Sequence, residues 1–597
     1  MREYTSPALA EITAGANISD LVYDNAVKAP HRVQLRRRVG ERWEDVTNRE
    51  FLAEVVALAK GLVAQGVSPG DCVGIMSRTR YEWTLADFAV WCAGGVPVPI
   101  YETSSAEQVE WILSDSSAVG VFVETAAHAA TVAEVRDQLP NLQHVWSFEA
   151  GDLEALVTAG SGISDDEIDS RRRHHTDESP ATLIYTSGTT GRPKGCELTH
   201  GNFLSEVYNV VASMPQMFNP EGSTLLFLPL AHVFARLIEV GCFHSGAQLG
   251  HTADVKNLLP DLATFQPTFI LSVPRVFEKV FNSSQAKAAA EGKGKIFDRA
   301  AGVAISYSEA LDRGGAGLFL KLQHAVFDKL VYSKLRTALG GRVRYAVSGG
   351  APLGARLGHF YRGIGVIILE GYGLTETSAG ATLNLPEAYK IGSVGRPVAS
   401  TSIKIADDGE VMIKGPIVYR GYHNNPVATK EAIEPDGWFH SGDIGELDDE
   451  GFLRITGRKK ELLVTAGGKN VAPAVLEDRL RAHALVSQCM VVGDNQPYIA
   501  CLITLDRESL PAWLKTHGKP EDMPIEQVVA DPDVTAAIQG AVDDANKAVS
   551  NAEAIKKFNI LTEDFTEEGG QLTPTLKLKR GVVMAEFKDA VDALYRK

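Results

Sequence analysis

The chain contains 597 residues, of which 45% are hydrophobic, and its 59 Lys and Arg against 75 Asp and Glu give a net charge of −16. A chain of this length and apolar content can form several packed domains, which excludes a disordered or fibrous protein. The acidic balance argues against a general nucleic-acid binder, because binding to a phosphate backbone depends on clustered Lys and Arg. Any polyanionic ligand must therefore meet positive charge that is placed locally.

The cysteines and the apolar stretches predict the cellular compartment of the protein. Six cysteines without a Cys-x-x-Cys pair are typical of a reducing compartment and predict neither a zinc site nor a disulfide framework. The first residues, MREYTSPALAEITAG, carry early charges and lack an apolar core, so we expect no secretory signal. The longest uncharged apolar stretch, 88–101, is too short to span a bilayer, which needs about 20 residues. We expect a cytoplasmic protein, with peripheral contact at the inner face of the membrane as an alternative.

In the first two-thirds of the chain, short β-branched runs alternate with amphipathic stretches, which is typical of βαβ units on a mostly parallel sheet. Three apolar strands run directly into polar or Gly-rich loops, at Thr186, Ser348 and Glu370. Because ligands bind just beyond the carboxyl ends of strands in open α/β sheets, we expect the chemistry in these loops. The pattern predicts an α/β protein with layered, mostly parallel sheets.

Residues 276–345 are rich in Ala, Lys and Gly and are predicted to be helical. One set of side chains recurs at spacings of three and four, namely Phe297, Ala300, Ala304, Tyr307 and Leu311. We interpret this set as the packing stripe of an inserted helix; the alternative is a membrane or partner surface.

The sequence pattern changes after about residue 398. Alternating strands joined by Asp-Gly and Glu-Gly turns predict hairpins and a small β subdomain over 398–457. The charged run GRKKELL then predicts an exposed junction, so we divide the chain into an N-terminal domain, 1–457, and a small α+β domain, 458–597. Two segments supply local positive charge, since 457–470 has four basic residues against one acidic and 571–597 has six against three.

The run YTSGTTGRPKG, from Tyr185 to Gly195, follows a predicted strand. Its glycines, hydroxyls and basic residues suit a loop that wraps phosphates with backbone N–H groups and Lys194. It is not a Walker A loop, because that motif requires Ser or Thr after the lysine, and here Gly195 follows Lys194. From composition alone, an ordinary Gly- and Thr-rich surface loop is the alternative.

This run resembles the signature loop of the adenylate-forming superfamily, which includes acyl-CoA synthetases, luciferases and the adenylation domains of peptide synthetases. The companion motifs SGGAPL, EGYGLTET, SGD, GRKKE and LTPTLKLKR follow in the family's order along nearly the whole chain. The resemblance implies a large N-terminal domain with a small mobile C-terminal cap. It also implies a reaction in two steps, in which a carboxylate and ATP form acyl-AMP and pyrophosphate, and a thiol then displaces AMP.

The resemblance also implies a role for each motif residue. The ATP- and AMP-binding set is Thr186, Ser187, Gly188, Thr189, Thr190, Lys194, Gly349, Gly350, Ala351, Glu370, Gly371, Tyr372, Gly373, Thr375, Asp443 and Arg458. In this set the backbone at 349–351 and the ring of Tyr372 would form the two walls of the adenine slot, and Asp443 would bind both ribose hydroxyls. Glu376 with Thr186 would hold Mg²⁺, and both are expected to take part in catalysis.

Lys577 is the candidate catalytic lysine, which would bridge the substrate carboxylate and the α-phosphate. The family usually has Gly directly before this lysine, where this chain has Leu576, and Lys579 stands two positions further on. We prefer Lys577 on the alignment of the motif. Lys460 is the expected hinge, with a solvated surface charge as the alternative.

The acyl and CoA sites are assigned in the same way. Gly467, Gly468 and Lys469 would approach the pantetheine arm, since bare backbone allows close passage. His232 would lie near the acyl and thiol sites, with a structural histidine as the alternative. The runs FLPLAHVFAR and SVPRVFEKV resemble the long-chain fatty-acyl-CoA synthetase branch. We therefore expect fatty acid, ATP and CoA as ligands, with Mg²⁺ and without nucleic acid.

Two alternative functions remain at this stage. A fatty-acyl-AMP ligase would pass the adenylate to a separate carrier protein instead of CoA. A non-catalytic member of the family would only bind nucleotide or lipid, although the intact set of Lys194, Glu376, Asp443, Arg458 and Lys577 argues against it.

Overall fold

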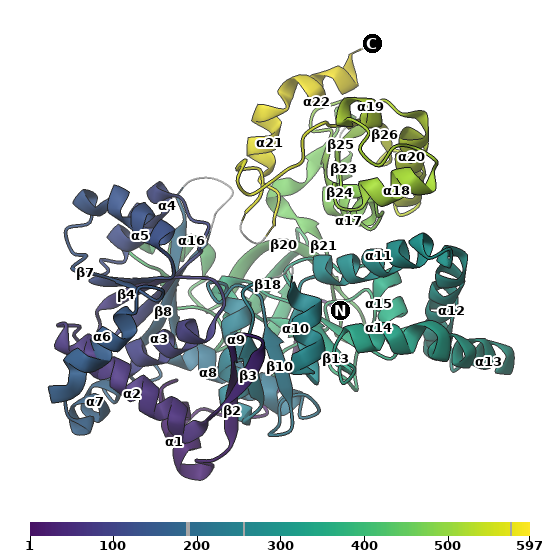
Figure 1. Ribbon diagram of the computed structural model, residues 1–597. Coiled ribbons are helices and arrows are strands. Elements are labelled where there is room, and N and C mark those ends of the chain that lie inside the picture. Colours follow the sequence, from purple (N-terminus) through teal and green to yellow (C-terminus); the bar gives the residue numbers. More distant parts are fainter. Residues whose placement is uncertain (187–191, 255–256, 468, 574–575, 597) are drawn as a thin grey trace.

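The structure is a computed structural model, and it describes residues 1–596 except 187–191, 255–256, 468 and 574–575. Figure 1 shows a large part, drawn from purple to green, with a smaller green and yellow part above it that ends at the C-terminus. No helix among the described residues is long and apolar enough to cross a membrane. The six cysteines are all free.

The first sheet has the strand order β5-β4-β6-β7, with every pair parallel. Its strands are β4 (Cys72–Met76), β5 (Val96–Ile100), β6 (Gly120–Val123) and β7 (His144–Ser147). Helices pack around it, namely α2 (Asn48–Ala64), α3 (Tyr81–Cys92), α4 (Ala106–Asp115), α5 (Ala126–Glu134), α6 (Asp152–Ala159) and α7 (Asp165–Arg172). The strongly apolar α3 is buried almost throughout. This region has the βαβ organisation that the sequence predicts.

The strand that leads into the TSGTTG loop differs from the expectation. β8 (Pro180–Thr186) pairs antiparallel with β9 (Lys194–Thr199), which pairs in turn with β19 (Gly421–Tyr422). The connection 187–193 is too short to join parallel neighbours, which need a crossover of a dozen or more residues. The loop therefore closes a hairpin, and it places Thr186 directly opposite Lys194.

Two further sheets form the centre of the large part. One has the order β10-β11-β2-β3 and the other β12-β13-β14-β15-β16. Their strands are β2 (Val33–Val39), β3 (Arg42–Thr47), β10 (Ser223–Leu226), β11 (Gln248–His251), β12 (Phe269–Ser272), β13 (Tyr345–Ser348), β14 (Ile367–Tyr372), β15 (Thr382–Leu383) and β16 (Arg396–Pro397). β12, β13 and β14 are parallel, so Ser348 and Glu370 are paired at the same sheet edge, as the sequence predicts.

The hairpins predicted after residue 398 are present. The sheet order is β1-β17-β18-β20-β21, all antiparallel, with β1 (Glu3–Thr5), β17 (Ser402–Ile405), β18 (Glu410–Lys414), β20 (Phe439–Leu447) and β21 (Leu453–Arg458). Gly409 and Gly451 take positive φ angles of 86° and 84° in the two turns, a conformation that glycine adopts without steric cost. The sequence analysis did not identify β1, a strand of three residues that pairs with a strand about 400 residues away.

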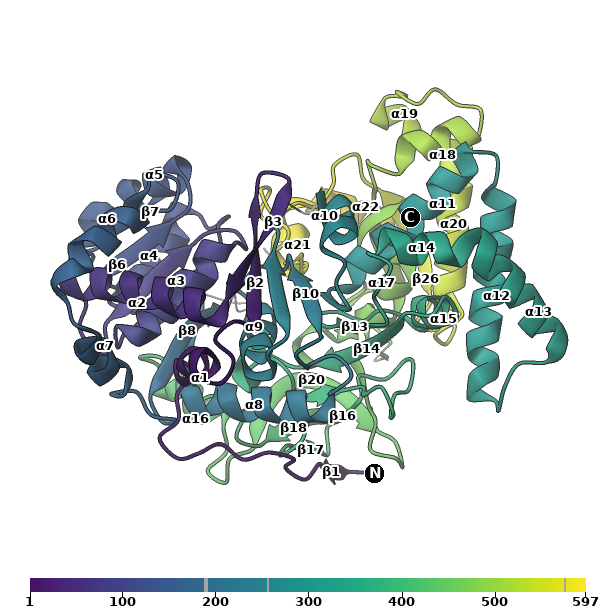
Figure 2. The same cartoon turned by 60° about the horizontal axis from the view of Figure 1, so that its bottom comes forward.

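Residues 274–338 form helices, and Figures 1 and 2 both show them as an arm that projects from the large part. They are α11 (Pro274–Ala290), α12 (Gly294–Asp312), α13 (Leu318–Phe327), a π turn (Asp328–Tyr332) and α14 (Ser333–Ala338). Within the predicted stripe, Phe297, Ala300 and Ala304 are buried, whereas Leu311 is 44% exposed. The packing interpretation therefore holds for most of α12. α13 has no buried residue.

The C-terminal part contains the hairpin β22 (Leu463–Val464) and β23 (Asn470–Val471) and the sheet β24-β25-β26. Those three strands are β24 (Val486–Val492), β25 (Ile499–Leu505) and β26 (Ile555–Ile560), and the helices are α17 (Pro473–Arg481), α18 (Leu510–Thr516), α19 (Ile525–Val529), α20 (Pro532–Asn546), α21 (Arg580–Glu586) and α22 (Lys588–Tyr595). Two hydrophobic clusters form its core, one that contains Val471 and one that contains Met490. Arg275 and Lys279 of α11 form ion pairs with Asp506 and Glu508, at 2.8 and 3.0 Å.

The remaining helices lie in the large part: α1 (Asp20–Lys28), α8 (His200–Ser213), α9 (Val233–Ser245), α10 (Leu258–Phe265), α15 (Ala355–Gly363) and α16 (Pro426–Ala432). Of these, α9 most directly supports the candidate site, because it begins directly after His232.

Candidate active site

The predicted ribose-binding residues meet across two bonded strands. Asp443 of β20 stands opposite Arg458 of β21 in the sheet register. The Nε atom of Arg458 donates a hydrogen bond of 2.9 Å to Asp443 Oδ1, and the hydroxyl of Tyr372 donates one of 2.6 Å to Oδ2. The Asp443 side chain is nearly buried. The carboxylate is thus fixed on both sides before any ligand enters.

The predicted adenine wall lies beyond the end of β13. Gly349 is packed so that an added Cβ would stand 3.2 Å from the ring of Phe234 and 3.6 Å from the carbonyl oxygen of Gly371. Gly350 has a φ angle of +83°, in the left-handed region, and Ala351 is exposed. A side chain at either glycine would be crowded or strained, so the backbone itself forms this surface.

Lys194 and Glu376 both contact Tyr422, a residue that the sequence analysis did not identify, and Thr186 is paired with Lys194 in the sheet. The Tyr422 hydroxyl donates a hydrogen bond of 2.9 Å to Glu376 Oε1. The Lys194 ammonium lies 4.7 Å from the centre of the same ring, which is cation–π geometry. Ser187, Gly188, Thr189 and Thr190 lie outside the described residues. A tyrosine in a strand of two residues carries no local signal of this kind in the sequence.

The same group of residues fits a magnesium ion held together with a nucleotide. A carboxylate and a hydroxyl are the oxygen ligands that Mg²⁺ prefers, and Mg²⁺ usually binds through one or two carboxylates plus substrate phosphates. Thr186 Oγ1 lies 3.9 Å from the Sγ atom of Cys196, and the Glu376 carboxylate contributes, after burial, to raising the pKa of the same thiol, so both residues lie near Cys196. Among the described residues, no cluster of three or more His, Cys, Asp or Glu could hold a metal.

The segment that follows Glu376 has a strained backbone. Ser378 and Ala379 have φ angles of 58° and 124°, and a Cβ at Gly373 would stand 2.0 Å from the carbonyl oxygen of Ala379. The backbone N–H of Gly380 donates a hydrogen bond of 2.6 Å to Oε1 of Glu206, which is buried in α8. Glu206 therefore fixes the segment behind the predicted metal ligand, and no motif in the sequence indicates it.

Glu370 and Thr375 support the site rather than present their side chains to it. Oε1 of the buried Glu370 accepts a hydrogen bond of 3.0 Å from the backbone N–H of Leu353, which links β14 to the SGGAPL loop. Burial, against the lowering effect of the Leu353 N–H and with a smaller contribution from Asp478 of the C-terminal part, raises the pKa of Glu370 to about 7. Thr375 begins a short 3-10 turn, and its carbonyl accepts the N–H of Ser378.

Leu576 and Lys577 turn back onto Thr573. The backbone N–H of Leu576 donates to the Thr573 carbonyl, and that of Lys577 donates to the Thr573 hydroxyl, at 2.8 and 3.0 Å. Leu576 has a φ angle of +59°. This is the left-handed conformation that favours glycine, the residue that the family has at this position. Lys579 instead stands directly before helix α21.

The charges around Lys577 are those of the nucleotide residues. Desolvation and the guanidinium of Arg458 lower the pKa of Lys577, and the carboxylates of Asp443 and Glu376 act in the opposite direction. Burial and then Lys577 lower the pKa of His232 to about 4, so this histidine is neutral at pH 7. The structure therefore brings the lysine of the C-terminal part to the same place as the residues of the large part.

His232 is oriented by the backbone around it. Its Nδ1 accepts a hydrogen bond of 3.2 Å from the N–H of Phe234, which leaves the proton of the neutral ring on Nε2. The segment before it is fixed by the Thr79 hydroxyl, which donates to the Leu228 carbonyl at 2.6 Å and accepts from the Leu230 N–H at 3.2 Å.

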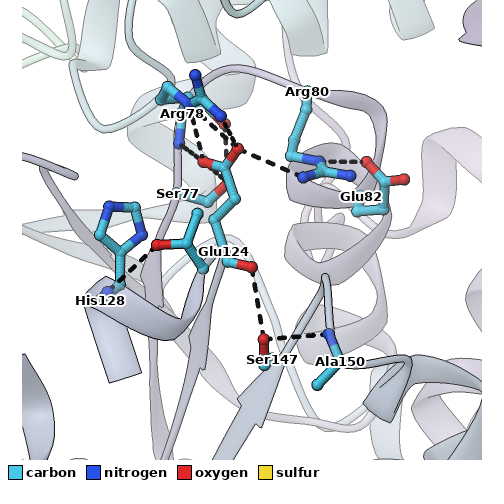
Figure 3. Close-up of polar contacts among 9 residues, drawn as sticks. Ser77, Arg78, Arg80, Glu82, Glu124, His128, Ser147 and Ala150 are labelled. Carbon is cyan, nitrogen blue, oxygen red and sulfur yellow. Dashed lines mark hydrogen bonds and ion pairs between the residues drawn. The ribbon is translucent and has the colours of Figure 1, made fainter. Parts of the chain in front are cut away.

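The residues on either side of Thr79, Arg78 and Arg80, belong to a polar cluster at the carboxyl end of the first sheet, shown in Figure 3. Glu124, which follows β6, accepts hydrogen bonds from the Arg78 backbone N–H at 2.9 Å and from Arg78 Nη2 at 2.6 Å. Arg80 Nη1 adds a contact of 3.4 Å to the same buried carboxylate. The cluster ties the ends of β4 and β6 together and fixes residues 77–80.

The predicted CoA and hinge residues do not join this site. Lys469 forms an ion pair of 3.5 Å with Glu553 of the C-terminal part. Gly467 is exposed on the β22–β23 hairpin, where an added Cβ would meet only Thr465 Oγ1, at 3.9 Å. Gly468 lies outside the described residues. Lys460 is exposed in a 3-10 turn at 459–461, and its neighbour Lys459 pairs with Asp408 at 2.6 Å. The structure therefore shows an arrangement with Lys577 at the nucleotide residues.

The model of the AMP-binding enzyme family matches residues 22–423, and the model of the AMP-binding enzyme C-terminal domain matches residues 460–597. The chain belongs to the AMP-binding enzyme family. This AMP-binding enzyme is 52% identical over 600 residues to the long-chain-fatty-acid–CoA ligase FadD15 of Mycobacterium bovis, with 100% of both chains covered. It is 31% identical to the long-chain-fatty-acid–CoA ligase ACSBG2 of Xenopus laevis, over 97% of this chain and 84% of the relative.

Solved structures show the same fold at lower identity. The didomain of carboxylic acid reductase from Segniliparus rugosus in complex with AMP has a TM-score of 0.74 at 22% identity, over 98% of this AMP-binding enzyme and 82% of that chain. ATP-bound MatB from Rhodopseudomonas palustris has a TM-score of 0.71 at 20% identity, over 97% and 100%. The predicted fold class, an adenylate-forming α/β enzyme with a large N-terminal and a smaller C-terminal domain, is confirmed.

Proposed function

We propose that the chain is an AMP-forming long-chain fatty-acid–CoA ligase, which activates the acid as acyl-AMP and then transfers the acyl group to the thiol of CoA. The observation that carries the proposal is the position of Lys577 among Asp443, Arg458 and Glu376. The names of the relatives at 52% and 31% identity support the substrate class.

The first step needs positioning more than proton transfer. A fatty-acid carboxyl group is ionised at pH 7, so it can attack the α-phosphorus without a general base. Asp443 would hold the ribose, Thr186 and Lys194 the phosphates, and Lys577 would bring the carboxylate and the α-phosphate together. Mg²⁺, held by Glu376 and Thr186, would neutralise phosphate charge. A cationic lysine suits this role, because it contacts both anions as they react.

The second step would use another face of the C-terminal part. We propose two domains, 1–457 and 458–597, joined at a hinge near Lys460, with rotation that withdraws Lys577 and brings Gly467, Gly468 and Lys469 to the thiol. The exposed hairpin of these residues and the exposed turn of Lys460 are compatible with such a rotation. Peripheral contact with a membrane belongs to the same proposal, because long-chain acids partition into bilayers.

The deciding experiment measures AMP release and thioester formation with CoA across acids from acetate to very long chains. We expect both products to depend on CoA and to be largest with long-chain acids. Acyl-AMP that accumulates without transfer to CoA would contradict the proposal and indicate a fatty-acyl-AMP ligase with a carrier-protein acceptor. No ATP–pyrophosphate exchange with any acid would indicate a member that only binds its ligands.

A further inference from the structure

Helix α13 presents an apolar face that no other part of the described chain covers. Leu318, Phe319 and Leu322 are 87%, 73% and 65% exposed, and Val326 and Leu330 continue the same stripe at helical spacing. α13 packs on α12 by its opposite face, where the His324 ring stacks on Tyr307 with centroids 4.0 Å apart. Both views show α13 at the far end of the arm (Figures 1 and 2).

The charge of the arm is opposite to that of the chain. The arm, residues 274–338, contains 11 Lys and Arg against six Asp and Glu, whereas the whole chain has a net charge of −16. Lys321 and Lys329 are exposed beside the apolar stripe, and neither forms an ion pair within the described part of the chain. The acidic Asp328 on the same segment is paired with Arg336 at 2.7 Å. The arm thus combines exposed apolar side chains with unneutralised positive charge.

This combination favours a lipid surface over a second copy of the chain. A helix that lies in a membrane interface has large apolar residues on one face and Lys or Arg beside them. A second copy would bring the same basic arms together, and like charges repel. A stable protein interface also covers about 800 Å² on each partner, whereas α13 with its ten residues is a strip of roughly 15 by 10 Å.

We propose that α13 docks the protein on an anionic lipid bilayer, with Leu318, Phe319 and Leu322 inserted among the acyl chains and Lys321 and Lys329 at the headgroups. The docking itself follows from these exposed residues. Its use, which is to take a long-chain acid from the bilayer in which it dissolves, rests on the proposed function.

The test is sedimentation of the full chain with phosphatidylcholine vesicles that contain or lack phosphatidylglycerol. We expect the unmodified protein to bind the phosphatidylglycerol vesicles and to dissociate from them at high salt. The combined substitution Leu318→Ser, Phe319→Ser and Leu322→Ser should weaken binding at least about tenfold, and so should Lys321→Glu with Lys329→Glu. Val27→Ser, at an exposed position of α1, is the matched control and should bind normally.

Activity measurements distinguish failure of the docking proposal from failure of the proposed function. ATP–pyrophosphate exchange with dissolved octanoate should be unchanged in the serine variant, which shows that the active site is intact. Vesicle binding that is equal in the serine variant and the unmodified protein would overturn the docking proposal, as would no binding to either vesicle. A dimer in analytical ultracentrifugation that the serine variant abolishes would overturn it in favour of a second copy. Loss of exchange with all acids would contradict the enzyme assignment and leave vesicle binding to decide the docking.

Discussion

Asp443 and Arg458 face each other across two hydrogen-bonded strands, whereas Lys577 is held in a turn by hydrogen bonds with Thr573 in the C-terminal part. The first pair is fixed by the register of β20 and β21 and by Tyr372; Arg458 is the first residue of the proposed C-terminal domain, but it precedes the proposed hinge at Lys460. Under the proposed function, Lys577 would reach the site only while the C-terminal part is docked. The nucleotide would then be bound mainly by the large part, and docking of the C-terminal part would supply the reactive charge.

The largest expected effect is the loss of that charge. Lys577→Ala should reduce adenylation by roughly 10²- to 10³-fold, the scale for removing one preorganised charged donor. ATP–pyrophosphate exchange measures it. Lys579→Ala is the matched control, because Lys579 stands before α21 outside the turn, and it should exchange normally. Exchange at the unmodified rate in the Lys577 variant would refute its assignment.

The second prediction tests whether the C-terminal part moves between the steps. Lys460→Pro restricts the backbone at the proposed hinge and should slow thioester formation by about tenfold or more, with less than about threefold effect on pyrophosphate exchange. Single-turnover measurement of each half-reaction separates the two. Lys460→Ala keeps the backbone free and should leave both steps near normal. Equal slowing of both half-reactions by proline would argue against a hinge.

The third prediction concerns the buried carboxyl of Glu370, whose pKa responds to burial and to Asp478 of the C-terminal part. The pKa of Glu370 is about 7 in the folded protein, above its usual 4.5, so the folded state binds more protons between these values. The raised pKa therefore adds roughly 3 kcal/mol to the free energy of unfolding below pH 4.5. This contribution is lost as the pH rises from 4.5 through 7. Glu370→Gln should therefore unfold at a higher temperature than the unmodified protein at pH 8 and at the same temperature at pH 4.

Thermal unfolding measured at both pH values checks this prediction. Glu134→Gln, at an exposed position of α5, is the control and should follow the unmodified protein throughout. A Glu370→Gln variant with the unmodified pH profile would show that this carboxyl does not titrate as its burial implies.

The smallest expected effect is at Leu576. Leu576→Gly removes a left-handed leucine, which costs about 1–2 kcal/mol, but it adds chain freedom that offsets about 0.5–1 kcal/mol. Stability should change by less than about 1 kcal/mol, and exchange should stay within about threefold. Leu576→Val, which is β-branched and fits this conformation worse, should lower both. A tenfold loss in the glycine variant would mean that the leucine side chain itself contacts the substrate.

The sequence predicted the features that local patterns specify. The Asp-Gly and Glu-Gly turns predicted the hairpins around Gly409 and Gly451, and the motifs predicted Asp443, Arg458 and Lys577 as neighbours of one site. Pairing over long distances was not predictable, because the pairing of β1 with β17 and of β19 with β9 depends on the complete fold. Tyr422 and Glu206 were missed for the same reason, since each acts on a motif residue that is distant in the chain.

One contact in the C-terminal part bears on the timing of the reaction. Arg580, three residues after Lys577, donates hydrogen bonds to Glu477 of α17 at 2.8 Å and to the Val491 carbonyl of β24 at 2.6 Å. These bonds attach the lysine turn to the same rigid unit that carries the β22–β23 hairpin. Under the proposed function, the lysine and the hairpin cannot both occupy the site, so a single molecule performs its two half-reactions strictly in alternation.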